Sequence, residues 1–375
     1  MSWLVPRFVP PHKVRGGTMT ATATRTRDDA LDALRGLAIF GMVLVNLQGS
    51  DAHVFPILAH APWNGLTIAD LVFPLFLLCV GLSLPLAMDG REPPASIGRI
   101  VRRSVLLYLI GFSIGWIVHA SPHLIDIRFT GVLARIGIVY LVCALTVRST
   151  SGWRVPALAA VALMAVHGAL LYAAPPGGVA SMAQGAGFSG WLDRAVLGGT
   201  RLYGKVFDPE GPLSTLSAIA TAMIGVAVQR LTIQRPNALF KTAVLCFVAA
   251  FGPWFLWPVN KALWTPTFVV INAAIGLGML CLLKSFWPSI GALSPVRLAA
   301  RLGQVALTLY VVHALLTAIL VIRVGGERLW VSSFDALTRL GLPLDWTSLL
   351  YAAIAGTLSV LITLALAKRG WVLRV

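Results

Sequence analysis

The chain has 375 residues, of which 57% are hydrophobic and only 12% are charged. A soluble domain carries about 25% charged residues, so this composition excludes a set of soluble domains whose surfaces face water. The net charge is +16, from 30 Lys and Arg against 14 Asp and Glu. Such an excess would suggest nucleic acid in a soluble protein, whereas in an apolar chain it first predicts orientation in a membrane.

Apolar runs long enough to cross a bilayer recur along the chain. A spanning helix needs about 20 mostly apolar residues, and continuous rather than alternating runs argue against a β-barrel. The predicted spans are 35–50, 67–88, 104–120, 130–147, 155–174, 213–229, 240–258, 266–283, 302–322 and 347–367. The sequence therefore predicts an all-α polytopic membrane protein, with a disordered tail over residues 1–30 and a single membrane domain over residues 31–375.

Basic residues are spread unevenly over the segments between these spans. With both termini in the cytoplasm, 20 of the 30 Lys and Arg residues lie on the cytoplasmic side and 8 lie in outer loops. This asymmetry follows the positive-inside rule, and it suits membrane lipids as partners without any need for nucleic acid. Residues 1–30 lack the apolar core of a cleavable signal peptide, and Met1 and Met19 are alternative starts of the chain.

Charged residues inside a span cost at least roughly 2.5–3.5 kcal/mol each, so they mark candidate sites. Asp32 and Arg35 enter the first span on one helix face, either as an interfacial ion pair or with Arg35 contacting an anionic ligand. Arg135 in the fourth span either pairs with a carboxylate, such as that of Asp70 or Asp126, or binds an anion.

The outer loop after the first span gathers groups that exchange protons. Asp51, His53 and His60 all lie in it. Histidine has the side-chain pKa nearest neutrality, which suits a general base, although a loop histidine is more often only solvated. Thr67 and Asp70 fit a helix-capping pattern, and Asp70 is equally suited to orient an imidazole.

Other motifs narrow the chemistry without identifying it. The four cysteines, at positions 79, 143, 246 and 281, lie singly in apolar runs, which indicates neither a zinc site nor a disulfide framework. No Walker loop, HExxH or GxSxG motif occurs in a suitable context. The residues alone leave both an enzyme and a solute carrier open.

Five segments, in order, carry a more specific pattern. They are Asp32-Ala-Leu-Arg35-Gly36 with Val45-Asn46, then His60-Ala-x-Trp63-Asn64-Gly65-Leu-Thr67-x-Ala-Asp70, then Ile127-Arg128-x-x-Gly131-Val-Leu-x-Arg135, then Phe207-Asp208-Pro209-Glu210-Gly211, and Asn260-Lys261-x-Leu-Trp264-Thr265. Together they resemble the heparan-α-glucosaminide N-acetyltransferase family, including its bacterial members.

The resemblance implies transfer of an acetyl group from cytoplasmic acetyl-CoA to the amino group of a terminal glucosamine-type sugar, without a metal. It assigns the catalytic histidine to His60 and an active-centre asparagine to Asn46. The acceptor contacts that it implies are Trp63, Asn64, Glu210, Asn260 and Lys261.

The loop between the two catalytic positions differs from that of the lysosomal members. His60 follows Asn46 by 14 residues, which is similar to the bacterial members and longer than the lysosomal loop. The luminal N-terminal domain and extra first helix of the lysosomal protein also have no counterpart in the pattern. We therefore expect a periplasmic amino sugar from chitin, peptidoglycan or another glycan as acceptor, and the bacterial inner membrane as location.

The implied mechanism assigns each polar residue a role. His60 acts as general base, Asp70 holds its tautomer, and the Asn46 amide either stabilises the oxyanion or positions the carbonyl. Arg35 and Arg135 contact the CoA phosphates. A ping-pong route through acetylated His60 remains an alternative.

Two other functions and the oligomeric state also stay open at this point. The alternatives are a sugar O-acyltransferase and, less favoured because no inverted repeat is evident, a solute transporter. A homodimer through a lipid-facing helix is compatible with the sequence.

Overall fold

The computed structural model describes residues 27–119 and 127–373, which form an all-α fold apart from one small hairpin. The predicted tail thus lies outside the described residues except for residues 27–30. The α-helices are α1 (Asp29–Asn46), α2 (Ile68–Met88), α3 (Ile97–His119), α4 (Val132–Ser149), α5 (Arg154–Leu171), α6 (Gly187–Leu197), α7 (Pro212–Gln234), α8 (Ala238–Trp254), α9 (Pro266–Ile290), α10 (Ser294–Gln304), α11 (Ala306–Leu320), α12 (Leu329–Thr338) and α13 (Leu344–Lys368). A 3-10 turn η2 (Gly199–Arg201) follows α6, and β1 (Arg323–Val324) pairs with β2 (Glu327–Arg328).

Seven of the described helices are long and apolar enough to cross a membrane, and a bent pair brings the number to eight. The seven are α2, α3, α4, α5, α7, α9 and α13. The first predicted span falls short because α1 carries Asp29, Asp32 and Arg35 within its 18 residues. The seventh falls short because α8 has only 17 residues. The multi-pass character is confirmed. The number of ten spans and the cytoplasmic location of both termini stay predictions.

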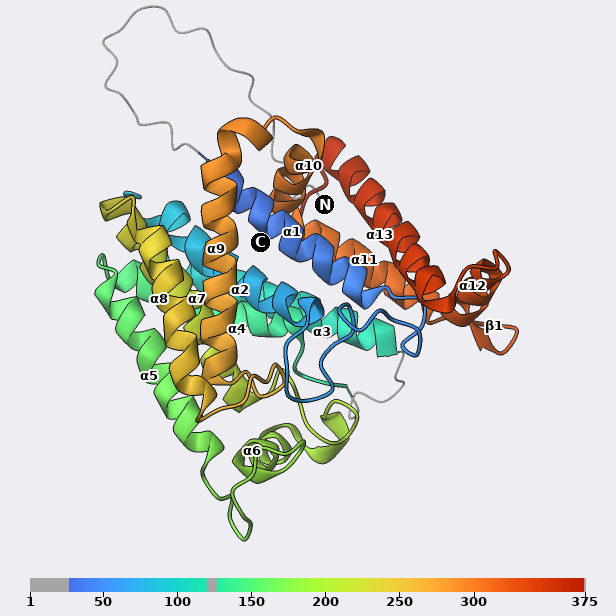
Figure 1. Ribbon diagram of the computed structural model, residues 1–375, viewed down its shortest axis with the longest axis horizontal. Coiled ribbons are helices and arrows are strands. Elements are labelled where there is room, and N and C mark those ends of the chain that lie inside the picture. Colours follow the sequence, from blue (N-terminus) through green and yellow to red (C-terminus); the bar gives the residue numbers. More distant parts are fainter. Residues whose placement is uncertain (1–26, 120–126, 374–375) are drawn as a thin grey trace, which may run out of the picture.

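The predicted span 302–322 is not one helix. It is replaced by α10 and α11, which meet at an angle of 85°. α10 packs against α1 through two glycines, because a Cβ on Gly303 would lie 1.8 Å from the Asp32 carbonyl oxygen and one on Gly36 would lie 1.8 Å from that of Ala299. This close crossing holds α10 beside α1, so the chain must turn sharply before α11 begins (Figure 1).

The first predicted span also begins too late in the sequence. α1 begins at Asp29 because the Asp28 side chain accepts a hydrogen bond from the Leu31 N–H at 3.1 Å, which caps the helix. It ends at Asn46, four residues before the predicted end, and leaves a longer loop to the next helix.

α2 and α7 form the centre of the bundle. A Cβ on Gly81 would lie 1.9 Å from the Ala222 carbonyl oxygen, and one on Gly225 would lie 2.5 Å from that of Leu78, so the two backbones touch. At the periphery, α3 and α5 expose large apolar side chains such as Leu109 and Leu158, which suits contact with lipid.

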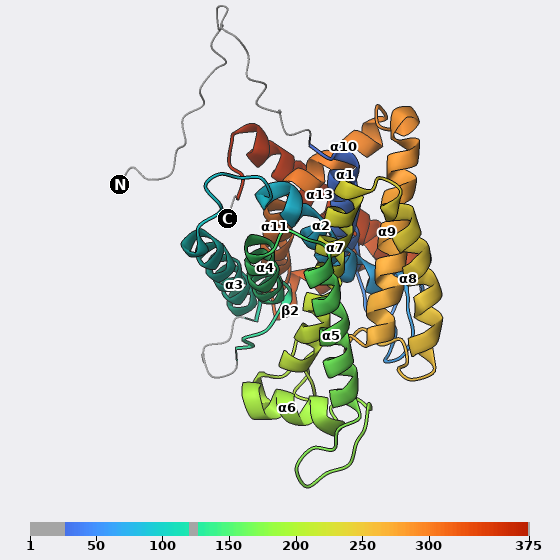
Figure 2. The ribbon, with the colours of Figure 1, turned by 90° about the vertical axis from the view of Figure 1, so that its left-hand side faces the viewer.

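One end of the bundle collects the long connections. α6 lies across this end, beyond α5 (Figure 2). The loop of residues 47–67 between α1 and α2 and the turn of residues 255–265 between α8 and α9 reach the same end (Figure 1). We call it the α6 end, and it carries the predicted site residues of both segments.

Candidate active site

His60 and Asp70 form a hydrogen-bonded pair at the start of α2. His60 Nδ1 lies 2.8 Å from Asp70 Oδ1. The His60 side chain is 47% exposed whereas that of Asp70 is 1% exposed, so the imidazole is open to an incoming molecule and its carboxylate partner is not. This is the arrangement of a base and the group that orients it.

The second oxygen of Asp70 stabilises the backbone around the pair. Oδ2 accepts hydrogen bonds from the Ala61 N–H at 3.1 Å, the Thr67 N–H at 3.1 Å and the Thr67 hydroxyl at 3.0 Å. The two roles left open for Asp70 are therefore combined in one carboxylate. Oδ2 caps α2 and closes the loop, while Oδ1 faces the imidazole.

Lys261 completes a cluster of three ionisable side chains. Its Nζ lies 3.0 Å from His60 Nδ1, 3.2 Å from His60 Nε2 and 3.5 Å from Asp70 Oδ1. Burial lowers the pKa of Lys261 from its ordinary value, while the carboxylates of Asp70 and Glu210 oppose that shift. His60 comes from the loop of residues 47–67 and Lys261 from the turn of residues 255–265. Within the described part of the chain, this cluster is where charged contacts join predicted site residues of these two segments.

Two further contacts join the loops that carry this cluster. Asn260 Nδ2 donates to Asn64 Oδ1 at 3.0 Å, and the Gly65 N–H donates to the Val259 carbonyl at 2.8 Å. Asn260 is fully buried whereas Asn64 is exposed. Both asparagines were predicted to contact the acceptor. Asn260 instead holds the backbone, and only the Asn64 side chain is accessible to a ligand.

Trp63 connects the cluster to the region around α6. Its indole N–H donates to the Met182 carbonyl at 3.0 Å, and its ring packs edge-on against Phe207 at 5.3 Å between centroids. Tyr203 continues this aromatic row, 6.0 Å from Phe207. The row extends from the His60 loop toward an exposed surface.

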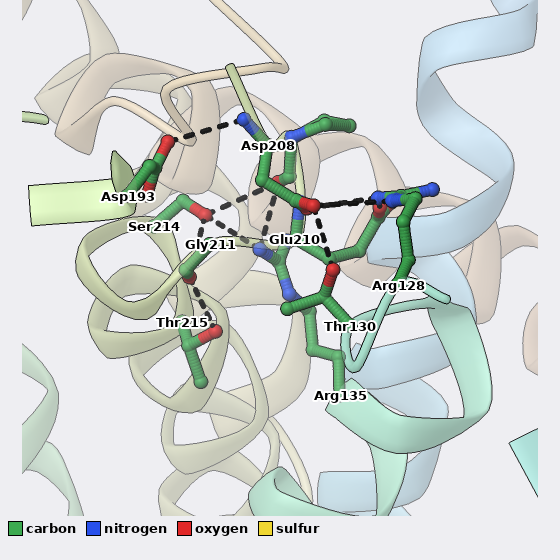
Figure 3. A network of polar contacts seen from close by, with 10 residues as sticks. Arg128, Thr130, Arg135, Asp193, Asp208, Glu210, Gly211, Ser214 and Thr215 are labelled. Carbon is green, nitrogen blue, oxygen red and sulfur yellow. Dashed lines mark hydrogen bonds and ion pairs between the residues drawn. The ribbon is translucent and has the colours of Figure 1, made fainter. Parts of the chain in front are cut away.

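A second polar network surrounds the turn before α7 (Figure 3). Arg128 binds both carboxylate oxygens of Asp208, at 3.1 and 2.8 Å, and Glu210 Oε2 at 2.8 Å. The Thr130 hydroxyl adds a bond to Asp208 at 2.6 Å. Burial alone would lower the pKa of Arg128, but the carboxylates of Glu210 and Asp208 raise it above its ordinary value.

Asp193 on α6 supports the same turn. Its Oδ2 accepts the Asp208 N–H at 3.1 Å in a buried setting. Burial raises the pKa of Asp193 to about 6, and the neighbouring Asp208 carboxylate adds to the rise. The charge of this carboxyl therefore changes in a mildly acidic range.

Arg135 lies beneath this turn (Figure 3). Its Nη2 donates to the Pro209 carbonyl at 2.7 Å and to the Ser214 hydroxyl at 2.5 Å, and its guanidinium lies 4.9 Å from the centre of the Trp264 ring. The side chain is 1% exposed. Asp126, one suggested partner, lies outside the described residues, and the Asp70 carboxylate bonds to other groups.

Arg35 lies at the opposite end of the bundle. It donates to Asp32 at 3.1 Å, to the Gly303 carbonyl at 3.2 Å and to the Ser83 hydroxyl at 2.5 Å. It also lines a cavity of about 820 Å³ between α1, α2, α3, α4 and the α10–α11 pair. The suggested Asp32–Arg35 ion pair therefore exists and borders a space large enough for a ligand.

The cavity combines basic and apolar walls. Arg27, Arg91 and Arg103 join Arg35 on its lining, whereas Met42, Phe76 and Leu133 line the part reached along α1, α2 and α4. Phe76 is six residues from Asp70 on α2, a rise of about 9 Å along the helix. The apolar part of the cavity thus extends toward the level of the His60 cluster.

The remaining predicted residue, Asn46, stands apart. It ends α1 as an exposed side chain, and no hydrogen bond of its amide to another described residue is present. His53 and Asp51 do not join the cluster either, since His53 lies 3.9 Å from Asp345. Sequence reasoning missed the support from Asp193 and Thr130, which no local motif signals.

Among residues 27–119 and 127–373, no group of three or more His, Cys, Asp or Glu side chains is arranged to hold an ion. The groups present suit proton transfer and the binding of anionic or polar ligands.

Long apolar helices around a charged cluster at one end and a basic cavity at the other define a polytopic membrane protein with a candidate active site. Sequence comparison then shows which proteins the chain is similar to. A model of the family described as heparan-alpha-glucosaminide N-acetyltransferase, catalytic, matches residues 27–176. The mouse protein heparan-alpha-glucosaminide N-acetyltransferase is 28% identical over 377 positions, covering 80% of this chain and 55% of its own.

The human protein of the same name is similar to this chain to the same degree. It is 28% identical over 341 positions, which cover 72% of this chain and 50% of the human protein. The chain thus spans about half the length of the curated relatives that it matches. These matches confirm the resemblance in the motifs: the chain is similar to heparan-α-glucosaminide N-acetyltransferases over most of its length.

Proposed function

We propose that this protein is a membrane acetyltransferase that moves an acetyl group from acetyl-CoA to the amino group of a glucosamine-type sugar. The observation that carries the proposal is the His60–Asp70 pair at 2.8 Å, formed within the segment that the family model matches. A sugar ammonium must lose a proton before it can attack a thioester, and this pair supplies the base.

His60 and Asp70 divide this chemistry between them. With the proton on Nδ1 directed at Asp70, Nε2 of His60 presents its lone pair to the acceptor amine. A general base of this kind contributes about 10²–10⁴-fold to the rate. Asn46 remains our prediction for a group that polarises the acetyl carbonyl from the end of α1.

The basic cavity suits the donor. Acetyl-CoA has a charged nucleotide end and a long, mainly apolar arm that carries the thioester. In the proposal, Arg35 and the arginines at positions 27, 91 and 103 contact the phosphates. The arm then extends past Met42 and Phe76 toward the His60 cluster. A role for Arg135 in contacting CoA stays a prediction.

The α6 end suits the acceptor. Exposed Asn64, half-buried Trp63 and partly exposed Glu210 surround the approach to His60. Donor and acceptor thus reach the reaction from opposite ends of the bundle. We place the donor in the cytoplasm and an amino sugar in the periplasm of a bacterium, with the protein in the inner membrane.

The test is acetyl-CoA-dependent N-acetylation of glucosamine by purified protein in lipid nanodiscs. We expect activity in the unmodified protein, its loss by at least about 10²-fold in His60→Ala, and its retention in the matched control His53→Ala from the same loop. Full activity in His60→Ala would exclude His60 as the base.

Acceptor choice and labelling separate the remaining alternatives. Acetylation of hydroxyl-only sugars, with glucosamine ignored, would replace the proposal by an O-acyltransferase. Incubation with labelled acetyl-CoA in the absence of acceptor distinguishes the two routes. A labile acetyl-protein that is lost in His60→Ala supports the ping-pong route, and an unlabelled protein supports direct transfer.

A further inference from the structure

Lys261 lies against the imidazole that has to receive the acceptor amine. Its Nζ is nearly equidistant from the two ring nitrogens, 3.0 Å from Nδ1 and 3.2 Å from Nε2, so it stands over the face of the ring and not on the in-plane lone pair of Nε2. A general base must lie within about 2.6–3.2 Å of the proton that it removes. The acceptor nitrogen can therefore take the in-plane lone pair of Nε2 while Nζ stays beside it.

The backbone beneath Lys261 is held in place by hydrogen bonds within its turn. Asn260 Oδ1 accepts the Leu263 N–H at 2.8 Å, the Trp264 N–H donates to the Lys261 carbonyl at 3.1 Å, and the Thr265 N–H donates to the Asn260 carbonyl at 3.2 Å. A turn with three such bonds restricts how far the base of the side chain can move.

Trp264, in the same turn, shows that the turn forms at a cost in backbone conformational energy. Trp264 has a φ of 55°, a left-handed conformation that is rare for a large side chain. Its burial, and the hydrogen bond from its indole to Thr221 at 3.1 Å, keep it there. Backbone strain of this kind costs about 1–3 kcal/mol and clusters at functional sites. The turn thus maintains Lys261 beside His60 against an unfavourable backbone conformation.

We propose that Lys261 is a catalytic residue whose ammonium group binds the acetyl carbonyl oxygen as it becomes an oxyanion. This inference rests on the proposed function and assigns Lys261 a role beyond contact with the sugar. Since the attacked carbon is bonded to the incoming nitrogen at Nε2, its oxygen lies within reach of the neighbouring Nζ. A preorganised cation at that point stabilises the transition state more than the ground state.

The step balances as follows. The acceptor ammonium first passes one proton through His60 Nε2 to water. The neutral amine then bonds to the thioester carbon and gives a second proton to His60 Nε2, while the carbonyl oxygen takes the negative charge beside Lys261. The carbonyl then reforms and the carbon–sulfur bond breaks. CoA leaves as a thiolate that takes the proton from His60, so His60 and Lys261 return to their starting states.

The test compares Lys261→Met with Lys205→Met, a lysine of an exposed turn near the α6 end, in the glucosamine assay. We expect Lys261→Met to lower kcat by about 10²–10³-fold, the loss caused by removing one oxyanion donor, with the KM for glucosamine within about threefold. Lys205→Met should match the unmodified protein. A raised KM with unchanged kcat would overturn the inference in favour of simple acceptor binding.

A second variant separates catalysis from structure. Lys261→Cys treated with 2-bromoethylamine carries an ammonium group on a side chain nearly as long as lysine. We expect this treatment to raise the kcat of Lys261→Cys at least tenfold. The unmodified protein, treated in the same way, controls for its four native cysteines. Treated Lys261→Cys that stays inactive, with an unchanged unfolding temperature, would overturn the inference.

These outcomes are distinct from failure of the proposed function. If the unmodified protein acetylates no acceptor, both proposals fail together. If it is active and sensitive to His60→Ala, but insensitive to Lys261→Met, the inference about Lys261 fails alone.

Discussion

Substituting Asp70 should separate its two roles, because each oxygen has different partners. In Asp70→Asn the amide oxygen can replace Oδ2 and keep the three donors from Ala61 and Thr67. The amide NH₂ then faces His60 Nδ1 and can only donate, which moves the imidazole proton to Nε2. That tautomer has no lone pair on Nε2 for the acceptor.

The two substitutions therefore differ in magnitude. We expect Asp70→Asn to lower kcat by about 10³–10⁴-fold, the effect of the wrong tautomer in a comparable triad, and to change stability by under about 1 kcal/mol. Asp70→Ala leaves three donors without an acceptor. At about 0.5–1.5 kcal/mol for each bond, it should destabilise the protein by roughly 2–4 kcal/mol as well as abolish activity.

The assay pairs kcat for glucosamine acetylation with unfolding of the purified protein in detergent. Thr67→Val removes one of the three donors and serves as a mild control for the capping role. The reasoning is refuted if Asp70→Asn keeps kcat within tenfold of the unmodified protein. The capping role of Asp70 is refuted if Asp70→Ala unfolds at the same temperature as Asp70→Asn.

Three further substitutions probe the helix crossing, the α6 network and the donor cavity. Gly36→Ala would place its Cβ 1.8 Å from the Ala299 carbonyl oxygen, so it should cost about 1–3 kcal/mol in unfolding measurements; Gly278→Ala, with no atom within 4 Å, should be neutral or stabilising. Because the pKa of Asp193 rises from 3.8 unfolded to about 6 folded, the folded chain binds that proton more tightly. Stability should therefore fall by up to about 3 kcal/mol as pH rises from about 4 to about 6, and Asp193→Asn should remove this dependence. Arg91→Gln should raise the KM for acetyl-CoA about tenfold, equivalent to about 1.4 kcal/mol, without changing the KM for glucosamine.

Each of these three expectations has an outcome that contradicts it. Equal stability of Gly36→Ala and Gly278→Ala would show that α1 and α10 are free to separate. A pH dependence that survives in Asp193→Asn would assign it to another group. An unchanged KM for acetyl-CoA in Arg91→Gln, measured beside Arg323→Gln as a control, would remove Arg91 from the donor site.

The sequence was informative where short-range chemistry decides the structure. Apolar runs predict membrane helices because any other conformation leaves backbone groups unsatisfied in lipid. His60 and Asp70 are ten residues apart on either side of a helix start, so a capping motif next to a histidine loop was enough to suggest their pairing. The resemblance to a family added candidate residues that composition alone did not identify.

The sequence was uninformative where distant segments meet. Lys261 is 201 residues from His60, and only the packing of α9 against α2 and α7 brings it there. The break before α11 depends on contact between two glycines, one on α1 and one on α10, which hydropathy does not record. The Arg135 environment likewise depends on a turn from another part of the chain, so a charge in a span did not reveal its partners.

The connection between α5 and α6 runs between the two halves of the His60 cluster in the sequence. His60 and Asp70 precede it, Lys261 follows it, and Val179 in its middle is 78% exposed. A chain divided there yields one fragment with the base pair and another with the cation, and neither fragment can assemble the cluster alone. Coexpressed in one cell, the two fragments regain the cluster only by finding each other in the bilayer. Acetyl transfer by such a divided protein would then report on complementation between its helices.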